Sequence, residues 1–426
     1  MKSIWNNIEK KSFDALEGNI KTDVLVIGGG MCGVLCAHML KNAGVECVLA
    51  EADEILKGVT NSTTAKVTLQ HGLIYDKIIK KYGVEKAYLY YESQKSAFDK
   101  IKELAGDNFQ MCSSYVYSLK DRDVIEKEML ALERIGVKAK FSERTELPFE
   151  VAGAVKMDNQ AKFHPLKFAY DIAKDLKIYE KTKIVELKNN IAITDNGTIE
   201  AEKIIVATHF PFINKHGGYF LKMYQHRSYV LALKNAASIK DMYVDEEKDG
   251  LSFRTYGSLL LLGGGSHRTG AKGGNWEELE RVAKKYYPDA KEVERWATQD
   301  CMTLDTMPYI GRYSKGTENL YVATGFNKWG MTSSMVSAMM LSDMVCGRKN
   351  KYEEVYNPSR NMLHPQLALN IFESAKGLLT PSVPRCPHLG CALKYNKAEH
   401  SWDCPCHGSR FDESGKLINN PATDDK

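Results

Sequence analysis

The sequence lacks a long hydrophobic run and a large excess of charge of either sign. The longest apolar stretch near a terminus, Met335–Cys346, is too short and too polar to span a bilayer. Residues 1–23 are polar and charged, without the apolar core of a signal peptide. The net charge is only +4 over 426 residues, and no basic patch of the nucleic-acid-binding type is evident. We therefore expect a cytoplasmic protein that is not transmembrane and has no nucleic-acid partner.

Internal repeats and low-complexity segments are also absent, whereas cysteine is plentiful and unevenly distributed. Six of the ten cysteines stand far apart in apolar or mixed contexts, where small buried hydrophobic side chains are expected. These six are Cys32, Cys36, Cys47, Cys112, Cys301 and Cys346. The other four, Cys386, Cys391, Cys404 and Cys406, fall within 21 residues, a density that indicates a dedicated site.

A glycine-rich turn near the start of the chain follows a predicted strand and opens a predicted helix. The apolar run Asp23–Ile27 suits a buried parallel strand, and Gly28-Gly-Gly30-Met-Cys-Gly33 fits G-x-G-x-x-G. The first glycine makes a tight turn and the second lets the backbone approach a pyrophosphate. The third lets helix and strand pack closely. The helix N-terminus, at Met31, favours the anion.

A carboxylate completes this βαβ unit. A second apolar run, Val45–Ala50, ends at Glu51, 23 residues beyond Gly28, where a carboxylate can hold ribose hydroxyls. An ordinary glycine-rich turn of an α/β protein is the alternative, but the strand, the helix and the terminal acid together favour dinucleotide binding. Glutamate at this position argues against a 2′-phosphate. No second G-x-G-x-x-G unit is present, which disfavours a separate NAD(P)H site.

Three later segments resemble flavin-contacting motifs of the D-amino-acid-oxidase family, which includes glycine oxidase, sarcosine oxidase and D-amino-acid dehydrogenase. Gly58–Lys66 resembles the second flavin-contacting loop, Ala207–Pro211 the strand end where the chain returns to the cofactor domain, and Ala323–Thr332 the final loop. In that loop, backbone amides at a helix N-terminus would stabilise the anionic reduced flavin. The resemblance covers roughly residues 20–372 and implies FAD bound by Gly28, Gly30, Met31, Gly33, Glu51, Thr60, Thr64, Ile184, Ala207, Gly330, Met331 and Thr332.

A substrate-binding residue is harder to identify. Phe253–Gly257 resembles the stretch where amino-acid oxidases place an arginine that clamps the substrate carboxylate, which makes Arg254 the candidate, with a structural ion pair as the alternative. Beside the cofactor motifs, His209, His267 and Lys328 are expected to have structural roles. Cys301, the one nearby candidate for covalent flavin attachment, is assigned to packing.

Two short segments near the end, Cys386-Pro-His-Leu-Gly-Cys391 and Cys404-Pro-Cys-His-Gly-Ser409, closely resemble the loops of a Rieske [2Fe–2S] domain. The resemblance implies that Cys386 and Cys404 bind one iron, that His388 and His407 bind the other, and that Cys391 and Cys406 form the disulfide between the loops. A zinc site is the alternative, but zinc does not explain Cys391, Cys406, Gly390 or the Gly408-Ser409 turn.

The cluster-binding segment departs from its family in two respects. Only a short linker precedes Cys386 where a base of β-strands is usual, and few residues follow Phe411, so we expect the segment to lean on the flavoprotein for burial. Phe411 also stands where high-potential members have a tyrosine hydroxyl that bonds to a ligand sulfur, so we expect a mid-range or lower potential.

The resemblances predict an α/β protein with a small β part. A discontinuous FAD-binding Rossmann-like domain is expected at about 20–70, 150–212 and 296–372. A substrate domain, mostly helical over 71–146 and sheet-rich over 224–266, is expected to be inserted at about 71–149 and 213–295. Together these form an oxidoreductase over 1–372, followed by a linker at 373–384 and a Rieske segment at 385–426.

The resemblance also implies a function. A FAD-dependent dehydrogenase would oxidise the C–N bond of an amine, imino acid or amino acid and pass electrons through the cluster to a protein or quinone acceptor. Dehydrogenase is favoured over oxidase because an attached one-electron relay competes with O₂. An electron-transfer or redox-sensing module that acts with a protein partner is the alternative.

Overall fold

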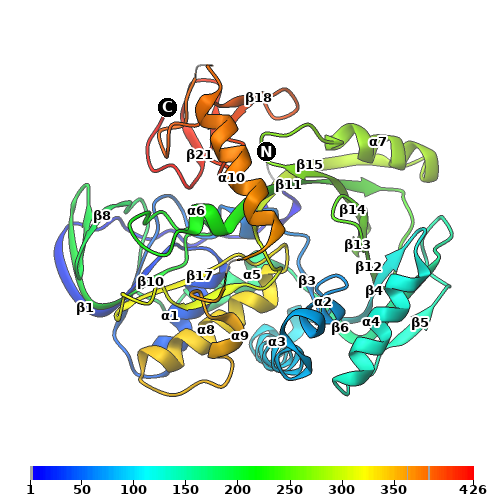
Figure 1. The fold of residues 1–426 in the computed structure, drawn as a ribbon, viewed down its shortest axis with the longest axis horizontal. Helices are drawn as coiled ribbons and strands as arrows, with labels where there is room; N and C mark the ends of the chain where they lie inside the picture. Colours follow the sequence, from blue (N-terminus) through cyan, green and yellow to red (C-terminus); the bar gives the residue numbers. More distant parts are fainter. Residues whose placement is uncertain (1–2, 362, 382–383) are drawn as a thin grey trace.

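The computed structural model describes residues 3–361, 363–381 and 384–426. Two large sheets with helices around them make up most of the molecule, and a small third sheet lies at the C-terminal end, beside α10 and above β11 (Figure 1). Among the described residues, no helix has the length and apolar character needed to cross a membrane.

The first large sheet is built on the predicted apolar runs. Its central strands are parallel, in the order β17 (Leu320–Thr324), β10 (Gly197–Val206), β1 (Gly18–Ile27) and β2 (Cys47–Ala50). Its outer strands are β16 (Tyr309–Arg312), β7 (Ile178–Tyr179), β8 (Ile184–Lys188) and β9 (Ile191–Thr194). Helices α1 (Met31–Asn42) and α8 (Gly330–Val345) pack together beneath this sheet, and α5 (Pro165–Ala173) contacts α1 (Figure 1). The predicted Rossmann-like core is therefore present.

The second large sheet is mainly antiparallel and corresponds to the predicted substrate side. Its strand order is β15 (Lys291–Thr303), β11 (Met223–Lys234), β14 (Leu259–Arg268), β13 (Ser252–Tyr256), β12 (Met242–Asp245), β4 (Gln110–Ser118), β6 (Gly153–Lys162) and β3 (Lys66–Val67), with β5 (Lys140–Ser142) beside β6. One face contributes Val230, Leu261 and Trp296, all at most 2% exposed, to the buried core that also includes residues of α1 and α8. The other face is covered by α7 (Asn275–Tyr286).

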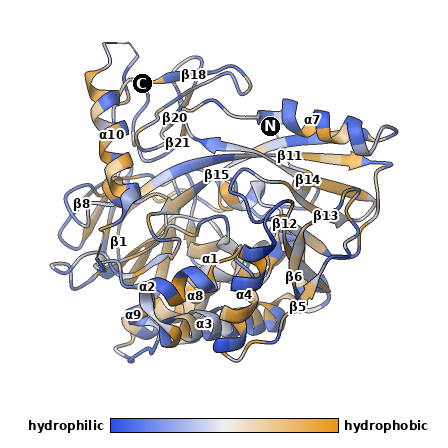
Figure 2. Ribbon diagram, turned by 45° about the vertical axis from the view of Figure 1, so that its right-hand side comes forward, coloured by the Kyte–Doolittle hydropathy of each residue, from blue (hydrophilic) through white to orange (hydrophobic). Residues whose placement is uncertain are grey.

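The remaining helices form the insert and the end of the oxidoreductase part. They are α2 (Tyr75–Tyr82), α3 (Val84–Ala105), α4 (Arg122–Arg134), α6 (Tyr219–Lys222), α9 (Glu353–Tyr356) and α10 (Pro365–Leu379). The helical character predicted for residues 71–146 is correct for α2, α3 and α4 but wrong for 110–118 and 140–142, which form β4 and β5. The predicted linker 373–384 is helical as far as Leu379. Helix α10 lies at the edge of the molecule and includes several hydrophobic residues (Figure 2), of which Leu379 is 82% exposed.

The C-terminal segment forms its own small antiparallel sheet. Strands β18 (Lys394–Asn396), β19 (Ser401–Asp403), β20 (Arg410–Asp412) and β21 (Leu417–Asn419) pair in chain order. They lie between and after the two cysteine-containing loops, and Phe411 fills their interior at 0% exposure. A sheet this small has little core of its own, so it depends on its contacts with the rest of the chain.

Candidate functional site

The glycine-rich turn joins β1 to α1 with very little free space. A Cβ atom on Gly33 would stand 1.8 Å from the carbonyl oxygen of Gly28, and one on Gly28 would stand 2.7 Å from the carbonyl oxygen of Ala207. Gly30 faces a more open side, where the nearest atom to a Cβ is the hydroxyl of Thr60 at 3.6 Å. The same hydroxyl accepts a 2.9 Å hydrogen bond from the Met31 amide. The turn thus presents bare backbone at the start of α1, as an approaching pyrophosphate requires.

Glu51 lies at the end of β2, directly beside this turn. Its carboxylate accepts hydrogen bonds from the Gly29 amide at 2.6 Å and the Asp53 amide at 3.0 Å. Burial raises the pKa of Glu51, and the hydrogen bonds from Gly29 and Asp53 oppose that rise. The carboxylate lies at the end of the second strand and beside the glycine turn, and its ribose-binding role stays a prediction. Ile184, at the start of β8, is buried in the sheet core behind it.

Arg254 lies in β13, within the segment that the sequence predicted to be sheet-rich. Its guanidinium contacts backbone carbonyl oxygens. One of its terminal nitrogens donates to the carbonyl oxygen of Thr64 at 2.6 Å and to that of Ala65, and the other donates to Phe163 at 3.4 Å. The side chain is 1% exposed, and its guanidinium carbon lies 5.5 Å from the ring centre of Trp5. These contacts brace the loop that carries Thr64 and leave no solvent-facing fork for a carboxylate.

Lys66 is the more accessible cation at this point. It is half-buried, and its Nζ lies 3.0 Å from the hydroxyl of Thr64 and 3.4 Å from that of Ser252. Burial, together with the neighbouring charge of Arg254, lowers the pKa of Lys66 to about 7. A bound anion would favour the charged form of this amine.

The N-terminus of α8, formed by Gly330, Met331 and Thr332, is held by a histidine that the sequence analysis did not identify. His71 contacts the hydroxyl of Thr332 at 3.1 Å through Nε2 and that of Tyr90 at 2.6 Å through Nδ1. Its ring stacks on Trp329 with the ring centres 5.1 Å apart. Burial lowers the pKa of His71 to about 3, so a neutral imidazole supports the helix start.

Several titratable side chains lie beside the loop that leads into α8. Lys328 donates to the carbonyl oxygen of Lys248 at 3.1 Å and to the Ser266 hydroxyl at 3.3 Å. His226 of β11 and Asp300 of β15 are cross-strand partners, so their side chains share one face of the sheet. Burial raises the pKa of Asp300 to about 6, although the charge of Lys328 opposes the rise. These titratable groups lie on the side of the sheet that faces the dinucleotide fold.

The two cysteine-containing loops have the same backbone geometry. In the first loop, the Cys386 amide donates to the carbonyl oxygen of Cys391 at 2.8 Å, and the Gly390 amide donates to that of Cys386 at 2.9 Å. In the second, the Cys404 amide donates to Ser409 at 2.8 Å and the Gly408 amide to Cys404 at 2.9 Å. Both glycines have positive φ, at 77° and 88°. Glycine is needed at these positions because the turn is left-handed.

The loops bring together the donor atoms that a Rieske cluster needs. Cys386 and Cys404 are buried and free, and the rings of His388 and His407 lie 5.0 Å apart. Within the described ranges, His388 Nδ1 and both ring nitrogens of His407 are buried without a hydrogen-bond partner. Buried polar atoms without partners are costly, and an iron ion would take up one nitrogen of each ring. The donor set of two thiols and two imidazoles therefore fits a [2Fe–2S] cluster.

A disulfide joins the loops beside this donor set. Cys391 and Cys406 are bonded to each other, with their Cα atoms 6.7 Å apart. The sulfur of Cys404 lies within 4.8 Å of both disulfide sulfurs. Gly377 of α10 packs directly on the bridge, because a Cβ there would stand 2.5 Å from the Cys406 sulfur. Helix α10 thus shields the disulfide from one side.

Two glutamines attach the second loop to the large antiparallel sheet. The amide nitrogen of Gln225 donates to the carbonyl oxygens of His407 at 3.1 Å and Asn420 at 3.0 Å. The amide nitrogen of Gln299 donates to the carbonyl oxygen of Gly408 at 2.8 Å and to Gln225 at 2.6 Å. Both glutamines are only 2% exposed, so these contacts form in a dehydrated setting where hydrogen bonds hold their geometry.

Asn420 connects the same segment to the strand end that follows β10. Its amide nitrogen donates to the carbonyl oxygens of Thr208 at 2.6 Å and Phe210 at 2.8 Å. Between them lies His209, at φ 67°, whose buried Nε2 has no partner within the described ranges. Burial lowers the pKa of His209 to about 4. A motif expected to contact flavin therefore also contacts the cluster-binding segment.

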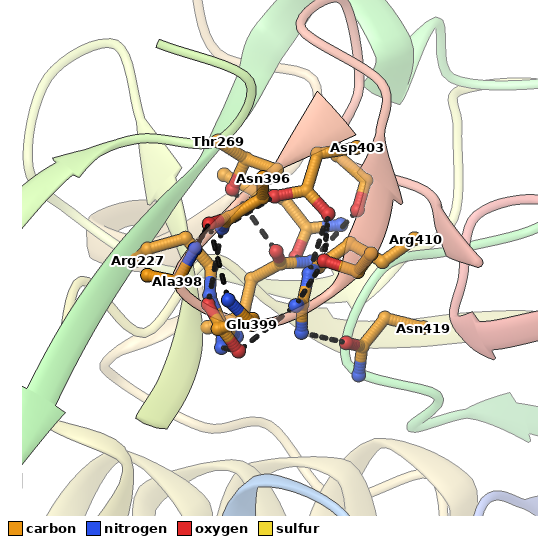
Figure 3. Close-up of polar contacts among 12 residues, drawn as sticks. Arg227, Thr269, Asn396, Ala398, Glu399, Asp403, Arg410 and Asn419 are labelled. Carbon is orange, nitrogen blue, oxygen red and sulfur yellow. Dashed lines mark hydrogen bonds and ion pairs between the residues drawn. The ribbon is translucent and has the colours of Figure 1, made fainter. Parts of the chain in front are cut away.

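A buried charge cluster completes the attachment. Glu399, which follows β18, pairs with Arg227 of β11 and lies 2.8 Å from Arg410 of β20, while Arg410 also reaches Asp403 at 2.9 Å (Figure 3). The Tyr229 hydroxyl donates to Glu399 at 3.1 Å. Burial raises the pKa of Glu399, but the charges of Arg227 and Arg410 outweigh this and hold it below its usual value.

Comparisons with known proteins agree with both halves of this arrangement. The model of the family described as FAD dependent oxidoreductase (DAO) matches residues 23–344, and that of the Rieske [2Fe-2S] domain matches 351–425. The chain belongs to the FAD dependent oxidoreductase family. Its C-terminal part is a Rieske domain, so its cofactors are FAD and a [2Fe–2S] cluster, as the sequence predicted.

Individual relatives cover most of the chain. A putative Rieske 2Fe-2S iron-sulfur protein, YhfW, of Bacillus subtilis is 34% identical over 96% of this chain and 94% of its own length. Gamma-glutamylputrescine oxidoreductase of Escherichia coli is 24% identical over 81% of this chain and 88% of its own. Among solved structures, L-proline dehydrogenase from P. horikoshii matches with a TM-score of 0.66 at 19% identity, covering 81% of this chain and 98% of that chain. The last likeness establishes the fold alone.

Proposed function

We propose that this protein is a dehydrogenase that oxidises the C–N bond of an amine, imino acid or amino acid and passes the electrons from FAD through its [2Fe–2S] cluster to an external acceptor. The junction formed by Asn420 and Gln225 carries the proposal. Asn420 bonds to the strand end at Thr208, and Gln225 joins Asn420 to the loop of His407. Gln225 is only 2% exposed, so its hydrogen bonds hold their geometry, and a fixed contact between the two cofactor motifs favours electron transfer within the chain.

The proposed FAD-binding residues are those predicted from the sequence. Gly28, Gly30 and Gly33, with Met31 and Thr60, would present the start of α1 to the pyrophosphate. Glu51 would accept from the ribose, Thr64, Ile184 and Ala207 would line the cofactor, and Gly330, Met331 and Thr332 would face the flavin. When bound, FAD supplies the acceptor for a hydride from the substrate carbon. The α8 N-terminus, braced by neutral His71, favours negative charge on the ring.

The proposed cluster ligands are Cys386, His388, Cys404 and His407, with Cys391–Cys406 as the bridge beside them. The cluster supplies a one-electron acceptor with a potential raised by its two imidazoles. For the domain division we keep the predicted boundaries, 1–372, 373–384 and 385–426. The end of α10 within the middle segment would act as a rigid spacer rather than a flexible linker.

The substrate class is proposed from the relatives and from the charged side chains of Lys66 and Asp300. A gamma-glutamylputrescine oxidoreductase and an L-proline dehydrogenase, by their names, act on nitrogen compounds. Lys66 offers a cation for an anionic group of the substrate. Asp300, whose pKa is raised to about 6, offers an acceptor for an ammonium proton at neutral pH. Arg254 is the less favoured clamp because its donors already serve backbone carbonyls.

An anaerobic titration of the holoprotein tests this function. Glycine, L-proline and gamma-glutamylputrescine would be added in turn while the flavin absorption and the electron paramagnetic resonance (EPR) signal of the reduced cluster are recorded. We expect at least one compound to bleach the flavin and then reduce the cluster. Flavin bleaching with a cluster that stays oxidised would contradict the relay. Bleaching by NADH alone would favour a reductase, and no bleaching by any amine would favour an electron-transfer module.

A further inference from the structure

The two predicted histidine ligands differ in their exposure to solvent. His388 is half-buried at the surface, whereas His407 is 2% exposed. The segment Asn214–Phe220 of the oxidoreductase part lies against both rings. The Asn214 side-chain oxygen is 3.1 Å from His388 Nε2, and the Phe220 ring meets His407 edge-on with the ring centres 5.9 Å apart.

This segment is fixed to the FAD-binding side of the molecule. The Tyr313 hydroxyl donates to the carbonyl oxygen of Ile213 at 3.0 Å, and the Tyr219 hydroxyl donates to that of Tyr313 at 2.8 Å. At its far end, Lys222 donates to the carbonyl oxygen of Pro358 at 2.9 Å. The segment is therefore part of the flavoprotein scaffold, and it reaches Asn214 only seven residues after the strand end at Ala207.

Asn214 contacts the Nε2 atom of His388, and Phe220 contacts the ring of His407. A ligand imidazole has one nitrogen for iron and a second N–H that can donate to a partner. In His388 the buried Nδ1 has no partner within the described ranges, while Nε2 already faces the oxygen of Asn214. In His407 both nitrogens are buried. The outer nitrogen of His388 is therefore taken by Asn214, and the remaining nitrogen of His407 is unpartnered but buried, so neither is presented to the carbonyl of an incoming quinone.

We infer that Asn214–Phe220 is an intramolecular cap that reserves the histidine side of the cluster for electrons from the flavin domain and prevents a quinone from binding there. This inference rests on the proposed function. The two electrons from each substrate molecule then leave one at a time to two molecules of a one-electron carrier protein, and the substrate protons pass to solvent. Asn214 is a positioning residue for His388, and Phe220 is the steric part of the cap.

The test uses dithionite-reduced holoprotein, which makes it independent of any amine substrate. Cluster reoxidation would be followed by stopped flow with decylubiquinone and, separately, with ferricytochrome c. We expect wild type to react with the carrier protein but only slowly with the quinone. Phe220→Ala and Asn214→Ala should speed the quinone reaction by roughly tenfold or more, the scale of one recovered hydrogen bond. Asn214→Ala should also shift the midpoint potential and EPR g-values of the cluster, with Asn190→Ala as the exposed control.

Different results would overturn the cap and the proposed function. Wild type that reduces the quinone as fast as the Phe220→Ala variant would overturn the cap, as would Asn214→Ala with an unchanged potential and spectrum. Iron and sulfide content would be measured first, and Phe220→Leu and Asn214→Ser replace any variant that loses the cluster. Failure of the proposed function looks different, since the cluster would then remain oxidised after amine addition while its reaction with dithionite and quinone stayed the same.

Discussion

The amide nitrogen of Asn420 lies 2.6 Å from the carbonyl oxygen of Thr208, which joins the last loop of the Rieske domain to the strand end that follows β10. Asn420 also accepts a hydrogen bond, through its own carbonyl, from Gln225. Gln225 also donates to the backbone carbonyl of His407, so the side chains of Asn420 and Gln225 together connect the two cofactor motifs. The two domains are therefore bonded at the point where electrons would cross.

The first prediction concerns this junction. Asn420→Leu removes the donor to the carbonyl oxygens of Thr208 and Phe210. The Phe210 carbonyl keeps its hydrogen bond from the Thr208 hydroxyl, so the loss should cost only about 1 kcal/mol. We expect slower electron transfer from flavin to cluster in anaerobic stopped flow, with the rate of flavin reduction by substrate unchanged. Asn190→Leu, in the exposed turn between β8 and β9, is the matched control. An unchanged transfer rate in Asn420→Leu would mean that electrons do not cross at this junction.

The second prediction concerns the buried charges at Glu399. Glu399→Gln leaves Arg227 and Arg410 without their shared carboxylate, and breaking a buried pair costs about 3–5 kcal/mol. We expect the Rieske domain of this variant to unfold first in a denaturant series followed by the cluster absorption. Glu413→Gln, on the exposed face of the same domain, should have no comparable effect.

The same carboxylate makes the attachment pH-dependent, which is the third prediction. The pKa of Glu399 is depressed in the folded protein, so its stabilising contribution is complete above the unfolded pKa of about 4.3 and is lost as the pH falls through the lower folded value. Wild type should therefore lose stability below about pH 4, as measured by thermal unfolding across the acid range. In the Glu399→Gln variant, the part of this stability loss at low pH that comes from Glu399 should be absent. Parallel curves for the two proteins would assign the acid sensitivity to other groups.

Local motifs could be predicted from the sequence far better than the contacts between them. The glycine turn and the two cysteine-containing loops follow from short-range backbone geometry, in which each glycine meets a steric or positive-φ requirement. Gln225, Gln299 and Asn420 have no motif, because their role depends on tertiary packing of segments more than a hundred residues apart. The strand β4 was missed because it lies between helices and pairs with β6 and β12, both distant in sequence.

The fourth prediction separates two roles for Arg254. Its guanidinium braces the carbonyl oxygens of Thr64 and Ala65, so Arg254→Met should weaken FAD retention and lower the thermal stability of the holoprotein. Arg254→Lys should restore only part of the FAD retention and thermal stability, since an ammonium lacks the planar fork of the guanidinium. FAD loss would be measured by ultrafiltration, with the exposed Arg281→Met as the control. A variant that keeps FAD and stability but shows a raised KM for a carboxylate-bearing substrate would instead support the substrate clamp.

The last prediction tests the iron ligands themselves. Cys386→Ser removes one of the two thiolates proposed to bind the first iron, so iron and sulfide should fall to near zero while FAD stays bound, because the glycine turn and α8 lie in the other part of the molecule. Cys346→Ser, a half-buried free cysteine at the end of α8, is the matched control and should retain both cofactors. With substrate, Cys386→Ser should still bleach its flavin but fail to reduce ferricytochrome c. Stoichiometric zinc in anaerobically prepared wild type, in place of iron and sulfide, would contradict the cluster assignment and with it the path from the junction at Asn420 to the acceptor.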